Sequence, residues 1–124
     1  MPDAICLRLP YPPSANRYWR SVVNKKTFRA MTFVSEEAKQ FKATVAKMCR
    51  QLDIQPFIGD VEMEISIYRP LKSGDLSNRI KVLEDSLSGF CYADDKQVKR
   101  IVAERFEDKD DPRVEVTVRA LGLL

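Results

Sequence analysis

The chain has 124 residues, of which 44% are hydrophobic and 31% are charged, and 21 basic against 18 acidic residues give a formal net charge of +3. A chain of this length can bury a core without metal or disulfide bonds, so we expect residues 1–124 to form a single domain. The sequence contains no histidine, which excludes Ser-His-Asp and Cys-His catalysis and histidine-based zinc sites. An enzyme built from this chain must use carboxylates, lysine, tyrosine, a thiol or an oxygen-ligated metal.

Cys6, Cys49 and Cys91 are far apart and form no CxxC pair, which argues against a zinc knuckle or a thioredoxin-type redox motif. We expect all three to be small buried hydrophobic residues in a reducing, cytoplasmic compartment. No stretch approaches the roughly 18 apolar residues of a membrane span, and the N-terminus lacks the pattern of a secretory signal. The sequence therefore predicts no membrane partner.

In the first half of the chain the sequence predicts one strand and one helix. Alternating apolar residues indicate a strand over 4–9, which the prolines at 10, 12 and 13 end. A loop is expected from there to about Phe33. Ser35 fits the N-cap of a helix over 35–52, with Glu36 and Glu37 facing the positive end of the helix dipole. The apolar stripe of this helix consists of Ala38, Phe41, Val45, Met48 and Leu52.

The second half predicts three strands and one helix. Apolar and polar residues alternate over 60–69, and Pro70 ends that strand. Asp75 is placed to cap a helix that ends before Gly89, where a C′ glycine is favourable. The buried face of this helix is expected to carry Leu76, Ile80, Leu83 and Leu87. Strands at 97–106 and 113–120 complete the order β-α-β-α-β-β, which predicts an α+β fold with two helices packed on a mixed sheet.

Charge is distributed unevenly along the sequence. No acidic residue lies between Ala4 and Ser35, whereas six basic residues and several aromatic residues do. Cationic side chains interleaved with aromatic ones suit a phosphate backbone and exposed bases. The alternative is a solvated loop whose aromatic side chains fill the core. Arg17 and Arg20, spaced by Tyr18-Trp19, are the most suggestive pair.

Carboxylates occur at two points where separate elements can converge at the end of a sheet. Asp75 lies at a strand-to-helix junction, and Asp94 and Asp95 lie just before a strand. Such carboxylates suit Mg²⁺ or Mn²⁺, which can polarise a phosphodiester and ionise an attacking water without histidine. Lys81, four residues after Ser77, is placed to stabilise the charge of a reacting phosphate. The structural alternative makes these acids a cap and a turn, with the lysine in solvent.

Three segments resemble, in the same order, the motifs of one family. The run at residues 9–20 is LPYPPSANRYWR, which resembles the opening LPxPPSxNRYxR of RusA-like Holliday junction resolvases. The run at 74–81, GDLSNRIK, resembles the DLDNxxK segment of that family, and YADDKQV at 92–98 also fits. Jointly these blocks cover most of the chain and make a specific match.

The resemblance implies a homodimeric, Mg²⁺-dependent endonuclease, with Mn²⁺ as a substitute metal, that resolves four-way DNA junctions by paired symmetric nicks. It implies catalytic roles for Asp75, Lys81 and Asp95 and metal ligation by Asp75, Asp95 and Asp94, while Asp85 falls on an acidic position of less certain role. Because the family is common in prophages, a phage-derived origin is expected. The residues expected to contact DNA phosphates are Asn16, Arg17, Arg20 and Lys72, and Arg79 is expected to contact a phosphate or form a surface salt bridge.

Ser77 departs from the family pattern, which has an aspartate at this position. A hydroxyl is a weaker Mg²⁺ ligand than a carboxylate and carries no charge. Asp94, Asp85 or Glu84 supplies the missing ligand, or the site works with one metal or a bridging water, or the protein binds junctions and cuts them weakly or not at all. Retention of the other matched catalytic residues favours an active nuclease. A junction-binding protein without nuclease activity and a small α+β interaction module are the alternatives.

Overall fold

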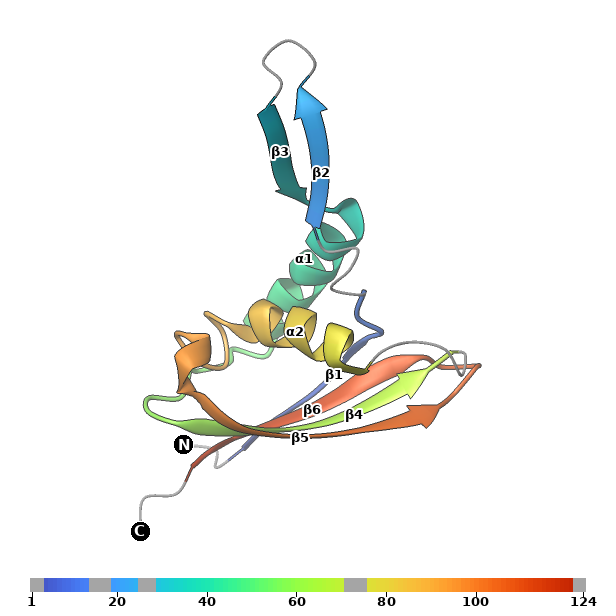
Figure 1. Cartoon of the computed structure of the whole chain (residues 1–124). Coiled ribbons are helices and arrows are strands. Elements are labelled where there is room, and N and C mark those ends of the chain that lie inside the picture. Colours follow the sequence, from blue (N-terminus) through green and yellow to red (C-terminus); the bar gives the residue numbers. More distant parts are fainter. Residues whose placement is uncertain (1–3, 14–18, 25–28, 71–75, 122–124) are drawn as a thin grey trace.

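The computed structural model describes residues 4–13, 19–24, 29–70 and 76–121. Four strands form a mixed sheet in the order β1-β6-β4-β5, and β2 and β3 form a separate hairpin. In Figure 1 both helices lie on one face of this sheet, and the hairpin extends beyond α1, away from the sheet. The elements are β1 (Ala4–Pro10), β2 (Trp19–Asn24), β3 (Arg29–Val34), α1 (Glu36–Gln51), β4 (Val61–Arg69), α2 (Leu76–Leu87), the 3-10 turn η2 (Asp95–Gln97), β5 (Val98–Glu107) and β6 (Arg113–Ala120). The predicted α+β fold, with two helices packed on a mixed sheet, is confirmed.

The sheet joins strands that are distant in the sequence. β6 lies between β1 and β4 and runs antiparallel to both. β4 and β5 are parallel, with Val61 opposite Val98 and Arg69 opposite Glu107. Parallel neighbours need a crossover connection, and α2 provides it. As a result α2 begins near the end of the sheet where β4 ends, and η2 lies near the other end of α2 (Figure 1).

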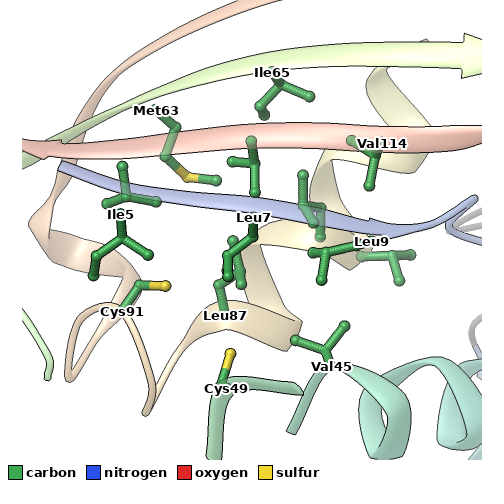
Figure 2. Packing of buried hydrophobic residues seen from close by; sticks show 14 of the residues in the cluster. Ile5, Leu7, Leu9, Val45, Cys49, Met63, Ile65, Leu87, Cys91 and Val114 are labelled. Carbon is green, nitrogen blue, oxygen red and sulfur yellow. The ribbon is translucent and has the colours of Figure 1, made fainter. Parts of the chain in front are cut away.

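The core lies between the helices and the inner face of the sheet, because one side of each alternating strand is apolar. Figure 2 shows Val45, Cys49, Leu87 and Cys91 on the helical side, facing Ile5, Leu7 and Leu9 of β1. The sheet buries Ile5, Leu7, Leu9, Val61, Met63, Ile65, Ile67, Val114, Val116 and Val118. The buried side chains of the helices are Ala38, Phe41, Val45, Cys49, Val82, Leu83, Ser86 and Leu87.

The start of α1 and the end of α2 agree with their local sequence signals. The Ser35 hydroxyl accepts a hydrogen bond from the Ala38 N–H at 3.3 Å, as expected of an N-cap. Gly89, after the end of α2, has a φ of 91°, a conformation that costs glycine little. No helix among the described residues is long and apolar enough to cross a membrane.

Three expectations are corrected. A hairpin with Trp19 opposite Val34 replaces part of the loop expected up to Phe33, because 19–24 and 29–34 are rich in strand-favouring residues. Leu52 is 57% exposed, since α1 ends one residue before it, and Cys49 completes the buried stripe instead. Cys6 is exposed because the alternation that buries Ile5 and Leu7 turns the residue between them to the outer face.

Candidate active site

The described part of the candidate site begins on α2. Lys81 is exposed, and Glu84 and Asp85 are half-buried. Residues three and four apart are neighbours on a helix surface. Lys81, Glu84 and Asp85 therefore form one charged face of the helix, called here the α2 charged face.

The turn before β5 carries Asp94 and Asp95, both exposed. Asp94 is the N-cap of η2, and its Oδ1 accepts a hydrogen bond from the Lys96 N–H at 2.9 Å. This bond is the main cause that holds the pKa of Asp94 below its usual value. Asp94 thus stays ionised and orders the turn on which Asp95 is mounted.

The pKa of Glu84 depends on charges from both α2 and the turn before β5. Burial is the main cause that raises the pKa of Glu84, and the negative charges of Asp95 and Asp85 raise it further, while Lys81 acts in the opposite direction. The charge of Asp95 thus influences Glu84 across the gap between the turn and α2. The sequence suggested Glu84 as one of three substitutes for the missing ligand. The available signal was its spacing of seven residues from Ser77, which places both on one side of the helix.

Tyr92 ties this turn to α2. Its side chain is fully buried, and its hydroxyl donates a hydrogen bond to the Glu84 carbonyl oxygen at 2.6 Å. The Tyr92 carbonyl in turn accepts from the Gly89 N–H at 2.7 Å. Burial, followed by the charge of Glu84, raises the pKa of Tyr92, so the phenol stays protonated as a donor. Sequence reasoning gave this residue no role, because nothing local shows which carbonyl a buried tyrosine meets.

The sequence predicts that carboxylates from two elements converge at one end of the sheet, and the strand directions do not support this. Because β4 and β5 are parallel, the end of β4 that leads to Asp75 and the start of β5 that follows Asp95 lie at opposite ends of the pair. Leu76 and Glu84 are about 12 Å apart along the helix axis, at 1.5 Å per residue. The turn before β5 therefore meets α2 at Glu84 and not at the end of the sheet where β4 ends.

Arg79 forms no ion pair with another described residue, and its guanidinium instead packs against the proline segment that follows β1. Its Nη1 donates a hydrogen bond to the Pro12 carbonyl at 2.7 Å, and its guanidinium lies 4.8 Å from the centre of the Tyr11 ring. These contacts hold the proline segment that precedes the basic block against the first half of α2. An open groove of about 410 Å³ lies beside them, lined by 10–13, by Arg79 and by the α1 residues Glu37, Gln40, Phe41 and Thr44.

Several predicted site residues stay predictions. Arg20 lies in β2 and Ser77 in the first turn of α2, but their side chains are outside the described part of the structure. Outside the described residues altogether are Asp75, Asn16, Arg17 and Lys72.

Glu84 and Asp85 of the α2 charged face and Asp95 of the turn before β5 all offer carboxylate oxygens, which suit a hard divalent cation. The ion pairs of the described residues involve other acids and leave these three carboxylates unpaired. No group of three or more Asp, Glu or Cys within the described ranges is arranged to hold a metal ion. The chemistry of the carboxylate oxygens thus fits a divalent cation, although the described residues alone do not assemble a site for one.

Comparison with known proteins covers most of the chain. The family model described as endodeoxyribonuclease RusA matches residues 10–119. The chain is 31% identical over 121 residues to the crossover junction endodeoxyribonuclease RusA of Escherichia coli (strain K12), with 94% of each chain covered, and equally similar to that of E. coli O1:K1 / APEC. The crossover junction endodeoxyribonuclease rusA of Enterobacteria phage HK97 is 29% identical over 92 residues, or 72% of this chain and 71% of the phage protein. The α2 charged face and the turn with Asp95 both fall inside the family match.

Proposed function

Because the chain belongs to the RusA family of endodeoxyribonucleases, we propose that this nuclease resolves four-way (Holliday) junctions by hydrolysing DNA phosphodiester bonds. One observation carries the proposal: the Tyr92 hydroxyl bonds the Glu84 carbonyl at 2.6 Å, which holds the turn that bears Asp95 against the helix that carries Glu84 and Lys81. This arrangement places carboxylates and a lysine together without histidine. The relative in phage HK97 agrees with the phage-derived origin expected from the sequence.

In this proposal Asp75, just before α2, and Asp95, in the turn before β5, would each be a ligand for Mg²⁺, for which Mn²⁺ could substitute, as the family resemblance implies. A divalent ion held by these residues would supply Lewis acidity for the phosphodiester and an attacking water of lowered pKa. One oxygen of Asp94 is engaged by the Lys96 N–H, so this residue offers its other oxygen and orients its neighbour. The exposed ammonium of Lys81 stabilises the negative charge of the reacting phosphate.

Glu84 replaces the carboxylate that Ser77 lacks. A half-buried glutamate beside Asp95 and Asp85 is unfavourable when ionised, as its raised pKa shows. A cation at this face relieves that repulsion, so Glu84 favours metal binding as an aspartate at position 77 would. Asp85 adds negative charge from the same helix turn. The rival function, junction binding without cleavage, is favoured by Ser77 alone.

The DNA contacts proposed from the sequence are Asn16, Arg17, Arg20 and Lys72. The docking of Arg79 on Pro12 supports this, because it holds the segment just before Asn16 against α2. Each phosphate contact adds to the salt dependence of binding, since it releases a counterion.

Paired nicks in opposite strands require two active sites, and a homodimer provides them. Support comes from β5, an edge strand whose Ile101, Val102 and Phe106 are exposed. An exposed apolar edge is a surface that a second copy can cover. Light scattering should give twice the mass of one chain for the wild type and a monomer for Val102→Lys, whereas Ile58→Lys, a change at a residue on the connection before β4, should stay dimeric. A monomeric wild type would exclude the dimer.

The nuclease function is tested on a synthetic mobile four-way junction, with linear duplex of the same sequence as the control substrate. We expect paired symmetric nicks only when the junction and Mg²⁺ or Mn²⁺ are both present. Asp75→Asn should abolish nicking while it preserves folding and junction binding. Tight binding without nicks in either metal would instead establish the junction-binding function.

A further inference from the structure

The side-chain amide of Gln97 makes four hydrogen bonds, all of them to backbone groups. Its Oε1 accepts from the N–H groups of Ala93 at 2.8 Å and Asp94 at 3.1 Å. Its Nε2 donates to the carbonyls of Phe57 at 2.9 Å and Gly59 at 2.7 Å. Two partners are donors and two are acceptors, so only an amide can satisfy all of them. Gln97 thereby uses its full hydrogen-bonding capacity.

These bonds connect the segment before β4 with the turn before β5. Pairing between β4 and β5 begins at Val61 and Val98, so the turn itself lies outside the ladder. A single 3-10 turn has weak hydrogen bonds and little stability of its own. Among the described residues, Gln97 makes the side-chain hydrogen bonds that join residues 93–97 to the rest of the molecule. Tyr92 holds only the other end of the turn, at α2.

Asp95 lies in the chain between Tyr92, which binds α2, and Gln97, which binds the segment before β4. The bond from the Tyr92 hydroxyl to the Glu84 carbonyl sets the start of this turn against α2, and the Gln97 bonds fix its end. A displacement of about 1 Å in a catalytic group can lower a rate on the order of a hundredfold. Without the Gln97 bonds, residues 93–97 would be held only at their two ends, by the contacts of Cys91 and Tyr92 and by the pairing of Val98 with Val61.

We propose that Gln97 is a positioning residue of this nuclease, which fixes the turn to residues 57–59 and so keeps Asp95 beside the α2 charged face. The inference rests on the proposed nuclease function, in which Asp95 is a metal ligand. It assigns Gln97 no contact with DNA or metal.

Two substitutions divide the four hydrogen bonds. Gln97→Glu keeps an acceptor for the Ala93 and Asp94 N–H groups but cannot donate to the carbonyls of Phe57 and Gly59. Gln97→Met has a similar length and removes both sides without adding charge. Gln51→Glu, at the exposed end of α1, is the matched control for the change of charge.

The full-length variants are compared in junction nicking across a Mn²⁺ titration, in junction binding with Ca²⁺, in thermal unfolding and in amide hydrogen exchange. We expect the Mn²⁺ concentration for half-maximal nicking to rise on the order of ten- to a hundredfold in both Gln97 variants, the range seen when groups that orient metal ligands are removed. Junction affinity should stay as in Gln51→Glu. Exchange at the Ala93 and Asp94 amides should accelerate most in Gln97→Met.

A wild-type Mn²⁺ midpoint in a folded Gln97→Met variant would overturn the positioning role and leave the nuclease function intact. If Gln97→Glu does not fold, Gln97→Met decides the question. If the wild-type protein nicks no junction, the positioning role falls with the proposed function. The exchange rates then show whether the Gln97 anchor exists, so the two failures are distinguishable.

Discussion

The hydroxyl of Tyr92 donates a hydrogen bond to the backbone carbonyl of Glu84 at 2.6 Å, which ties the turn bearing Asp95 to the helix that carries Lys81. The tyrosine ring is fully buried, so the bond is shielded from water and the hydroxyl has no solvent partner. One buried side chain therefore couples the stability of the fold to the geometry of the site.

Tyr92→Phe should lower the free energy of unfolding by about 1–2 kcal/mol, because it removes a buried hydrogen bond but keeps the ring. Urea unfolding measures this change. Tyr68→Phe is the control, since Tyr68 is half-buried and its ring stacks on Phe106 at 5.1 Å between centroids. A change within about 0.5 kcal/mol is expected there. Equal losses in the two variants would show that the Tyr92 bond adds nothing.

Glu84→Gln should make the metal-free protein more stable at pH 7. The pKa of Glu84 is raised above its ordinary value of 4.5, first by burial. The folded state therefore holds this proton more tightly than the unfolded state, and the stability that the protonated group provides is lost as the pH rises through the folded pKa. The advantage of the variant should shrink as the pH falls below the ordinary value.

Urea midpoints at pH 4 and pH 7 test this dependence. The control is Glu104→Gln, a change of an exposed glutamate on β5, which should leave the difference between the two midpoints as in the wild type. A Glu84→Gln protein that is less stable than wild type at pH 7 without metal contradicts the expected sign.

Ser77→Asp should rescue Glu84→Gln. If Glu84 replaces the missing carboxylate, Glu84→Gln weakens metal activation on the order of tenfold or more. The double variant should recover most of this loss, while Ser77→Asp alone should change the metal midpoint little. Mn²⁺ titrations of nicking and of thermal unfolding give two independent readouts. A large improvement in metal activation from Ser77→Asp alone would mean that no residue replaces the missing carboxylate.

Lys81→Met should lower the rate of nicking on the order of a hundredfold, because it removes a positive charge at the reacting phosphate. Junction binding in Ca²⁺ should fall only slightly, since one charge among several phosphate contacts is lost. Lys47→Met, at an exposed position of α1, should nick at the wild-type rate. Single-turnover kinetics at saturating protein separate the chemical step from binding. Undiminished nicking by Lys81→Met would remove this residue from the mechanism.

Arg17→Ala and Lys72→Ala should each reduce the dependence of junction affinity on salt. Each lost phosphate contact is expected to lower the slope of log K against log salt by about 0.9. Fluorescence anisotropy between low and moderate salt measures the slope, and Lys47→Ala serves as the control. A residue whose replacement leaves the slope unchanged does not contact a phosphate.

Much of the fold could be predicted because its signals are local. The alternation over 60–69 predicts β4, and Ser35 predicts the start of α1, because each rests on the period or the capping chemistry of neighbouring residues. The hairpin of β2 and β3 was missed, since its basic and aromatic content favoured a loop. Cys6 was placed in the core by residue type, although its place in the alternation puts it outside.

For the candidate site, too, the sequence determined some features and the tertiary structure others. Sequence alone determined which groups are available: no histidine, the aspartates at 75, 94 and 95, and Lys81, in blocks that resemble one nuclease family. Only the tertiary structure decided that Tyr92 binds the Glu84 carbonyl and that Gln97 bridges to the carbonyls of Phe57 and Gly59, which sets the turn of Asp95 against α2. The reason is physical: side-chain type follows from the sequence, whereas these interactions join positions 8 to 40 residues apart, and the packing of α2 over the parallel β4–β5 pair brings them together.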